Sequence, residues 1–214
     1  MEIKWFGHSC FRLRDKAGVV VTDPFPRTLG YERPRLRADI VTVSHPHENH
    51  SDIRGFQGEP FVIDGPGEYE VNGIFVTGVR TYHDGTKGKQ RGFNTIYLIQ
   101  YQDMNVCHLG DLGHVPTQDQ VEELSEVDVL LVPVGGGGAL TSAQAAEVVS
   151  LIEPRLVIPM HYRTEVYTGD LDPVDKFLKE MGLKDAPVEE ELKRSKSQLP
   201  EETEVVVLTY GASG

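Results

Sequence analysis

Ser44-His45-Pro46-His47-Glu48-Asn49-His50-Ser51-Asp52 places three histidines within six residues, directly after the apolar run 40–43. The length and β-branched content of that run are typical of a buried strand. A strand that ends in His-x-His-x-x-His delivers three imidazoles from one edge, and imidazole is the commonest transition-metal ligand. The alternative, a solvated His-rich turn, is disfavoured because isolated surface histidines rarely adopt this spacing. The stretch therefore predicts a metal site at the end of a strand.

Other polar residues stand at the ends of predicted strands. They are His83, Asp111 and His161, which follow the runs 76–82, 106–110 and 156–160. Each alone has an ordinary alternative, as a capping group, a turn aspartate or a partly buried histidine. Together they repeat one arrangement, a polar residue where an apolar strand stops, and α/β sheets place their ligand sites there. We therefore expect them to join the three histidines in one site.

The composition is that of one globular domain, which we expect to span residues 1–214. With 21 basic against 33 acidic residues the net charge is −12, so the surface repels polyphosphate backbones and no nucleic-acid partner is expected. No signal-peptide pattern and no apolar run of about 18 residues indicates export or a membrane partner. Cys10 and Cys107 lie in separate strand-like segments, which argues against a disulfide framework. A cytoplasmic protein is expected.

The predicted elements divide the chain into two halves. The first reads as strands over 3–6, 10–13, 19–22, 40–44, 95–100 and 105–109, with a hairpin over 68–81 that turns at Asn72-Gly73. In the second, strands over 129–134 and 156–159 alternate with helices over 117–124, 145–152 and 173–181. A capping box, Thr141-x-x-Gln144, precedes the middle helix. The charged segment 187–203 is interpreted as a surface excursion and 205–208 as a last strand. This order predicts an α/β (α+β) sandwich of sheets covered by helices.

The motifs resemble, in order and spacing, those of the metallo-β-lactamase-fold hydrolases. They are His45-x-His47-x-x-His50, then His83, then Gly110-Asp111, then Pro159-Met160-His161-Tyr162. Within that family the chain is most similar to the short prokaryotic metal-dependent hydrolases akin to ascorbate-6-phosphate lactonase, with supporting matches at 6–9, 22–25, 66–68, 133–136 and 142–162. The resemblance covers nearly the full chain. It implies a four-layer αβ/βα sandwich, in which two mixed sheets are flanked by helices and the metal ions lie at the sheet edges.

The resemblance also implies a ligand set. One ion would be held by His45, His47 and His83, and a second by His50 and His161, with Asp111 bridging both. Asp23 would orient the loop 45–50 from behind the ligands, as metal-bound imidazoles usually require. Zn²⁺ is the expected ion, with Mn²⁺ and Fe²⁺ as alternatives, because cellular availability outweighs intrinsic affinity. Asp111 and His161 would also act in catalysis, and His8, in the Gly7-His8-Ser9 turn, either faces the substrate or is a structural turn residue.

Asn49 is where the chain departs from the family's pattern. That pattern is His-x-His-x-Asp-His, and its aspartate ligates the second ion, whereas this chain carries Asn49. A neutral amide oxygen is a weak ligand, although Asn49 could still coordinate weakly or hydrogen-bond the bound water. Glu48 offers a carboxylate one residue earlier, but we expect its side chain to point away from the metals. One tight site and a weak or labile second site are therefore predicted.

Several other residues are candidates for substrate contact. Lys87, Lys89 and Arg91 lie in the loop directly after His83, and three cations in an acidic protein could bind an anionic group such as a phosphate. A solvated hairpin tip is the alternative. Tyr162 and Arg163 adjoin His161 and are expected to contact the substrate. The glycine run 135–138 leads to the predicted helix start, whose N–H groups could also receive an anion, but it lacks the Gly-Lys-Thr of a nucleotide P-loop.

The predicted function is that of a metal-dependent hydrolase. A metal-bound hydroxide, formed from water whose pKa falls toward about 7, would cleave an ester, lactone or phosphodiester in a small substrate, with or without a phosphate. The alternative is a metal-binding protein of the same fold with impaired or lost catalysis, because Asn49 replaces the aspartate. An RNA-processing nuclease on this fold is disfavoured by the net charge and by the lack of a basic arm.

Overall fold

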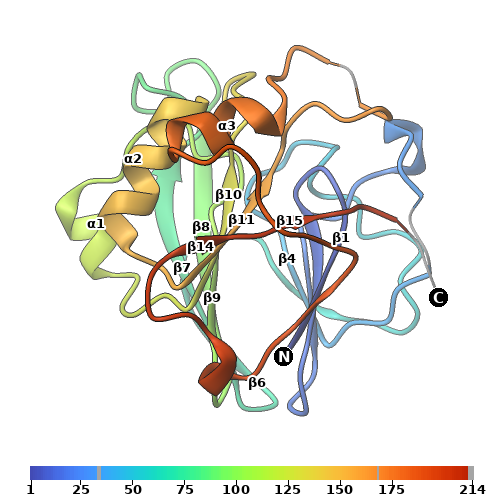
Figure 1. Ribbon diagram of the computed structural model, residues 1–214. Coiled ribbons are helices and arrows are strands. Elements are labelled where there is room, and N and C mark those ends of the chain that lie inside the picture. Colours follow the sequence, from blue (N-terminus) through green and yellow to red (C-terminus); the bar gives the residue numbers. More distant parts are fainter. Residues whose placement is uncertain (33–34, 168, 212–214) are drawn as a thin grey trace.

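Two mixed β-sheets form the centre of the computed structural model, which describes residues 1–32, 35–167 and 169–211 (Figure 1). The first sheet has the strand order β13-β1-β2-β3-β4-β5. Its strands are β1 (Glu2–Gly7), β2 (Cys10–Arg14), β3 (Val19–Thr22), β4 (Ile40–Thr42), β5 (Phe61–Ile63) and β13 (Leu192–Lys193). β1, β2 and β3 pair antiparallel, whereas β3, β4 and β5 pair parallel.

The second sheet has the order β14-β11-β10-β9-β8-β7-β6. Its strands are β6 (Gly67–Val71), β7 (Ile74–Tyr82), β8 (Phe93–Gln100), β9 (Asn105–His108), β10 (Val129–Pro133), β11 (Leu156–Met160) and β14 (Glu204–Val205). The four strands from β6 to β9 form an antiparallel meander, and β9, β10, β11 and β14 are parallel. The predicted hairpin is present between β6 and β7, where Asn72 and Gly73 both adopt positive φ, as a two-residue turn of this kind requires.

Strand residues of the first sheet alternate between two cores, because successive side chains of a strand point to opposite faces. Val20 and Ile40 belong to the large core that also contains the second sheet's β8 to β11, so the two sheets pack face to face. Their neighbours Val21 and Val41 belong to a smaller core with Phe25, Tyr31 and Leu36 from the loop between β3 and β4. Loops therefore cover the outer face of the first sheet.

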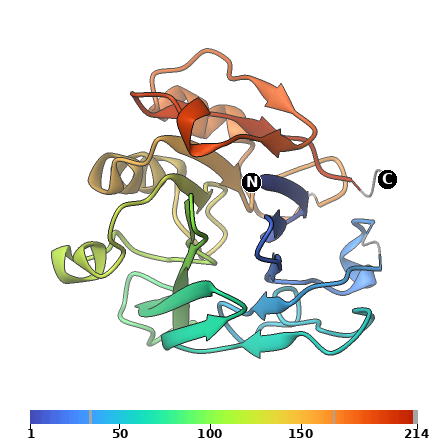
Figure 2. The ribbon, with the colours of Figure 1, turned by 90° about the horizontal axis from the view of Figure 1, so that it is seen from below.

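The α-helices lie on one side of the molecule. They are α1 (Gln118–Glu122), α2 (Ser142–Ile152) and α3 (Val174–Glu180). All three flank the second sheet, and among the described residues none flanks the blue strands of the first sheet in either view (Figures 1 and 2). The two mixed sheets predicted from the sequence are confirmed, but the helical layer expected over the first sheet is replaced by loops and the one-turn helix η1 (Arg27–Leu29). None of the described helices has the length and apolarity needed to cross a membrane.

The C-terminal part of the chain departs from the expectation in two places. The segment 187–203, expected to be a surface excursion, contributes β13, which pairs with β1 and buries Leu192 at the sheet edge. The strand expected over 205–208 is divided, because Glu204–Val205 extends the second sheet while β15 (Val207–Leu208) pairs with β12 (Val188–Glu189). A short 3-10 helix, η2 (Lys196–Gln198), lies between these strands. These strands have only two residues each, so they contain no alternation of polar and apolar residues that could be recognised in a sequence.

Candidate metal centre

Loops from both sheets meet at one point, at the ends of β4, β7, β9 and β11. The loop after β4 carries His45, His47 and His50, and the other three strands are followed by His83, Asp111 and His161. Asp111 lies at the middle: its Oδ2 is 3.3 Å from Nε2 of His50, 3.3 Å from Nε2 of His161, 3.5 Å from Nε2 of His83 and 4.0 Å from Nε2 of His45. The structure therefore brings together the polar residues that the sequence placed at strand ends.

Two of the buried polar atoms at the centre lack hydrogen-bond partners in the protein. Asp111 is 4% exposed and His45 is 6% exposed. Asp111 Oδ1 and His45 Nε2 have no hydrogen-bond partner. A buried polar atom without a partner costs on the order of 1–3 kcal/mol, so native proteins rarely leave one unsatisfied. Two such atoms, on residues that belong to one cluster of possible ligands, fit a site that is completed by a cation.

Asp23 fixes the tautomers of two of the histidines. Its Oδ1 accepts the N–H of Ser44 at 2.7 Å, while its Oδ2 accepts the Ser44 hydroxyl at 2.5 Å and Nδ1–H of His50 at 2.9 Å. Since the Ser44 hydroxyl donates to the carboxylate, its oxygen accepts from Nδ1 of His45, 3.0 Å away. Both imidazoles thus carry a proton on Nδ1 and turn Nε2 toward the centre, the orientation that metal-binding histidines adopt.

The electric field at the centre favours a cation. Burial acts to lower the pKa of His50, but the carboxylates of Asp111 and Asp23 outweigh it and raise this pKa to about 10. Burial also acts to raise the pKa of Asp111, but His161 and His50 hold it well below its usual range. Burial lowers the pKa of His45 to about 3, so its imidazole is neutral and available as a ligand. The raised pKa of His50 shows that the field at this buried ring favours positive charge, which a metal ion can supply in place of a proton. Imidazoles around an ionised carboxylate are a donor set that transition metals bind.

The described residues form three groups whose ligand atoms lie within 4.8 Å of one another. They are His45, His83 and Asp111; His45, His47 and His50; and His8, His50 and His161. His47, expected to share an ion with His45 and His83, is exposed and groups with His45 and His50. The histidines and Asp111 therefore fit one or two metal ions.

Asn49 and Glu48 point to different sides of the histidine loop. Asn49 lines a cavity of about 520 Å³ together with His47, His50 and Asp111. Glu48 instead lines a groove of about 920 Å³ on the far side of the loop, which none of the histidines borders. The expectation that Glu48 points away from the metals therefore agrees with the structure, and its carboxylate does not replace the missing aspartate.

The cavity beside the histidines is bordered in part by residues that the sequence did not single out. Tyr167, Asp170 and Leu171 border it, together with Gly137 and Gly138 of the glycine run. A second cavity of about 530 Å³, lined by Pro46 and Phe93, adjoins it and shares His47, His83 and Arg91. No pattern marks Tyr167, Asp170 and Leu171 in the sequence, because their side chains reach the site only through the path of the chain after β11.

Two expected substrate contacts lie elsewhere. Tyr162 belongs to the large core, where its ring packs 5.2 Å from that of Trp5. Arg163 is exposed and lines neither cavity. Both expectations rested on adjacency to His161, which adopts a left-handed backbone with φ of 50°. The chain turns away from the centre after His161, so adjacency in sequence does not place these two side chains at the substrate cavity.

Of the three basic residues that follow His83, only Arg91 borders the cavities beside the histidines. Arg91 borders both cavities, and its guanidinium passes so close to Gly138 that a Cβ there would lie 2.3 Å from Cζ. Lys87 borders a separate pocket with Tyr82 and His114, and Lys89 lines neither of the cavities beside the histidines. The structure therefore separates Arg91 from the two lysines.

Asp84, which the sequence analysis missed, shapes the loop that carries Arg91. Its Oδ1 accepts from the backbone and hydroxyl of Thr86 and from the N–H of Gly88, and its Oδ2 accepts from the N–H groups of Gln90 and Arg91, all within 2.7–3.0 Å. Burial acts to raise the pKa of Asp84, but these hydrogen bonds hold it below its usual range. An aspartate followed by a Gly-rich run was the available signal.

Comparison with protein families gives one match that spans most of the chain. The Beta-lactamase superfamily domain matches residues 2–161. This stretch contains every strand end of the centre, from the histidine loop to His161.

Individual proteins give the same result. A UPF0173 protein of Pyrococcus furiosus is 31% identical over 206 residues, covering 85% of this chain and 90% of its own. A UPF0173 metal-dependent hydrolase of Pyrococcus horikoshii is 26% identical, with 77% and 85% covered. A crystal structure from Thermotoga maritima, of a protein proposed to be a Zn-dependent hydrolase of the metallo-β-lactamase superfamily, superposes with a TM-score of 0.80 at 39% identity, covering 97% of this chain and 98% of that one. The metallo-β-lactamase fold expected from the motifs is confirmed, while the lactonase subgroup stays a prediction.

Proposed function

Because the chain belongs to the β-lactamase superfamily, and to the UPF0173 family within it, we propose that it is a metal-dependent hydrolase that cleaves an ester, lactone or phosphodiester bond in a small anionic molecule. The observation that carries this proposal is the position of Asp111. Its Oδ2 lies within 4.0 Å of Nε2 of four histidines, and its Oδ1 has no protein partner. A carboxylate among imidazoles is a donor set that transition-metal ions bind, and a carboxylate oxygen without a protein donor can accept a hydrogen bond from water.

The residues that would hold the metal divide on either side of Asp111. His45, His47 and His83 would hold one ion, and His50 and His161 a second, with Asp111 between them. Zn²⁺ is the ion proposed, since imidazole suits it. When bound, such an ion lowers the pKa of a coordinated water and polarises a substrate carbonyl or phosphoryl oxygen.

The protein's own part is to orient the reactants. Asp111 Oδ1, free of protein donors, would accept a hydrogen bond from the attacking water and hold its lone pair toward the substrate. Asp23 keeps the Nδ1 protons of His45 and His50 in place, which directs the opposite nitrogens to the centre as ligand atoms. The cavity of about 520 Å³ suits a small molecule rather than a polymer.

Arg91 supports an anionic substrate. Among the described residues its guanidinium forms no ion pair, and it borders both cavities beside His83. Burial lowers the pKa of His83, and the nearby charge of Arg91 acts in the same direction. A guanidinium without a protein partner at the edge of a substrate cavity can donate two parallel hydrogen bonds to a carboxylate or phosphate. The apolar lining by Pro46 and Phe93 would receive the uncharged part of the same molecule.

The test of the proposed function is hydrolysis that depends on added metal. Chelator-treated protein would be screened with lactones, thioesters and phosphodiesters, with and without Zn²⁺, Mn²⁺ and Fe²⁺. Hydrolysis should return with metal in the wild type and not in Asp111→Asn. The rival function, a metal-binding protein without catalysis, is favoured by Asn49 alone; it predicts metal binding with no turnover of any of these substrates.

The role of Arg91 has its own test. Arg91→Ala should raise KM for an anionic ester by about 10- to 100-fold, since hydrogen bonds to charged groups contribute roughly 1.5–3 kcal/mol. KM for a neutral ester of the same shape should stay unchanged. Lys87→Ala is the matched control, because Lys87 borders a different pocket, and it should change neither value. Equal effects of Arg91→Ala on the charged and neutral esters would show that Arg91 does not bind the anion.

A further inference from the structure

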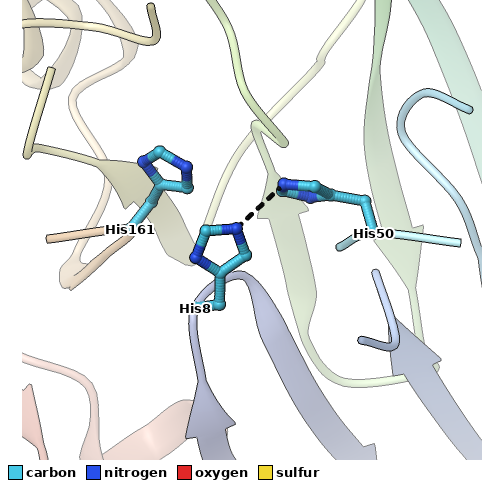
Figure 3. Close-up of side chains that lie close together, drawn as sticks. All are labelled: His8, His50 and His161. Carbon is cyan, nitrogen blue, oxygen red and sulfur yellow. Dashed lines mark hydrogen bonds between the residues drawn. The ribbon is translucent and has the colours of Figure 1, made fainter. Parts of the chain in front are cut away.

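His8 reaches the centre from the turn between β1 and β2, far in sequence from the other ligands. Its ring lies between those of His161 and His50, with centroids 4.4 Å and 4.7 Å away (Figure 3). Its Nε2 is 3.1 Å from Nε2 of His50, and one ring nitrogen from each of the three residues lies within 4.8 Å of the others. We propose that His8 is a metal ligand and that His8, His50 and His161 form a three-imidazole site for the second ion. The inference rests on the proposed function only in its assumption that the centre binds metal.

The backbone holds His8 in this place. Its carbonyl accepts Nε1–H of Trp5 at 3.0 Å and the backbone N–H of His161 at 3.1 Å. The second bond ties the β1–β2 turn directly to the residue whose imidazole shares the site. The preceding Gly7, with φ of 111°, packs so tightly on Tyr31 that a Cβ would lie 2.4 Å from the ring. The position of His8 is therefore set by the fold and not by a flexible loop.

The conformation of His8 is itself unfavourable. Its φ is 52°, in the left-handed region, and His161 opposite has φ of 50°. Non-glycine residues in this region cost on the order of 1–3 kcal/mol and are concentrated at functional sites. A residue needed only for the turn would be replaced by glycine without that cost. An imidazole that is 4% exposed and faces two others suggests that the side chain itself is required.

The distances suit direct coordination. Two imidazole nitrogens bound at 2.0–2.1 Å to a tetrahedral ion are about 3.3–3.4 Å apart. His8 and His50 are separated by 3.1 Å, and Asp111 Oδ2 is 3.3 Å from both His50 and His161. A hydrogen bond between His8 and His50 has a similar length, but it does not explain why a nitrogen of a third imidazole, that of His161, lies within 4.8 Å of both.

A ligand at His8 would compensate for the asparagine that stands at position 49 in place of the family's aspartate. Asn49 is half-buried, and its backbone N–H donates to Nδ1 of His47 at 3.3 Å. His8 supplies a neutral nitrogen where the family's pattern has an anionic oxygen. Three imidazoles suit Zn²⁺, Fe²⁺ or Co²⁺, whereas Mn²⁺ and Mg²⁺ prefer oxygen ligands. The second site of this chain should therefore select nitrogen-preferring ions.

The experiment measures metal binding and not activity. Chelator-treated wild type, His8→Gly and Asn49→Ala would be titrated with Zn²⁺ by calorimetry, with circular dichroism as the check of folding. Glycine is chosen because it accepts the left-handed backbone. Wild type and Asn49→Ala should bind two ions per chain. His8→Gly should bind one ion with unchanged affinity and the other about 100-fold more weakly. The loss of a direct ligand should be at least as large as the loss of a residue that supports a ligand, which is about 10- to 100-fold.

A rescue experiment separates a lost ligand from a disturbed turn. Free imidazole can enter the space left in His8→Gly through the open cavity and should restore part of the second affinity, together with the visible absorption of Co²⁺ at that site. Should His8→Gly misfold, His8→Asn suits the same backbone and gives the same comparison. Two-ion binding by a folded His8 variant at wild-type affinity would overturn the inference while leaving the proposed function intact. Absence of zinc binding in the wild type would overturn both.

Discussion

Asp111 divides the centre into an outer half, His45, His47 and His83, and an inner half, His8, His50 and His161. In the outer half His47 is exposed, and His45 reaches Asp23 only through the Ser44 hydroxyl. In the inner half His50 is 1% exposed and bonded by Asp23, while the backbones of His8 and His161 are bonded to each other. The sequence favoured a tight outer site and a weak inner one. The preorganisation of the metal ligands therefore depends on the hydrogen bonds that hold them, and the ligand motif in the sequence does not reveal those bonds.

The largest difference between the halves should follow from removing the carboxylate behind His50. Asp23→Asn replaces an acceptor by a group that cannot accept both the Ser44 hydroxyl and His50 Nδ1–H in the same way. We expect the inner ion to lose about 10- to 100-fold in affinity, the usual loss for a residue behind a metal ligand. The outer ion should lose less, because Asp23 reaches His45 only through Ser44. Calorimetric titration of both ions gives the result, and an equal loss at both would contradict the division.

What could be predicted from the sequence is what short-range patterns encode. The histidine spacing, strand-end positions and Asn72-Gly73 turn are local, and each is present in the structure. Loop-covered cores such as the one around Tyr31, and strands of two residues such as β13, depend on contacts between distant segments. The same holds at the site. The sequence leaves His8 either facing the substrate or as a structural turn residue, because its approach to His50 and His161 depends on how β1 and β11 pack.

A smaller effect should follow from weakening the support of the outer half. Ser44→Ala removes the hydroxyl that links Nδ1 of His45 to Asp23. Nothing would then hold the proton of His45 on Nδ1, and the outer ion should bind roughly threefold to tenfold more weakly. This loss is smaller than the loss of about 10- to 100-fold expected for removing a carboxylate that contacts a ligand directly. Asp23 keeps its bond to His50, so the inner ion should bind as in the wild type. A selective loss at the inner ion would show that the two halves have been assigned in reverse.

The smallest effect is expected where the motif departs from the family's pattern. If the inner ion lacks a ligand, Asn49→Asp should raise its affinity strongly; if His8 already fills that position, the added carboxylate brings only charge and the gain should stay below about tenfold. The double variant His8→Gly/Asn49→Asp distinguishes the two cases, because residues that serve one coordination position are not additive. With His8 absent, the introduced carboxylate should recover most of the lost affinity, so the same substitution has a small effect in the wild type and a large one in the variant. Equal gains in both backgrounds, measured by zinc titration, would mean that positions 8 and 49 act independently and that the inner half is not a three-imidazole site.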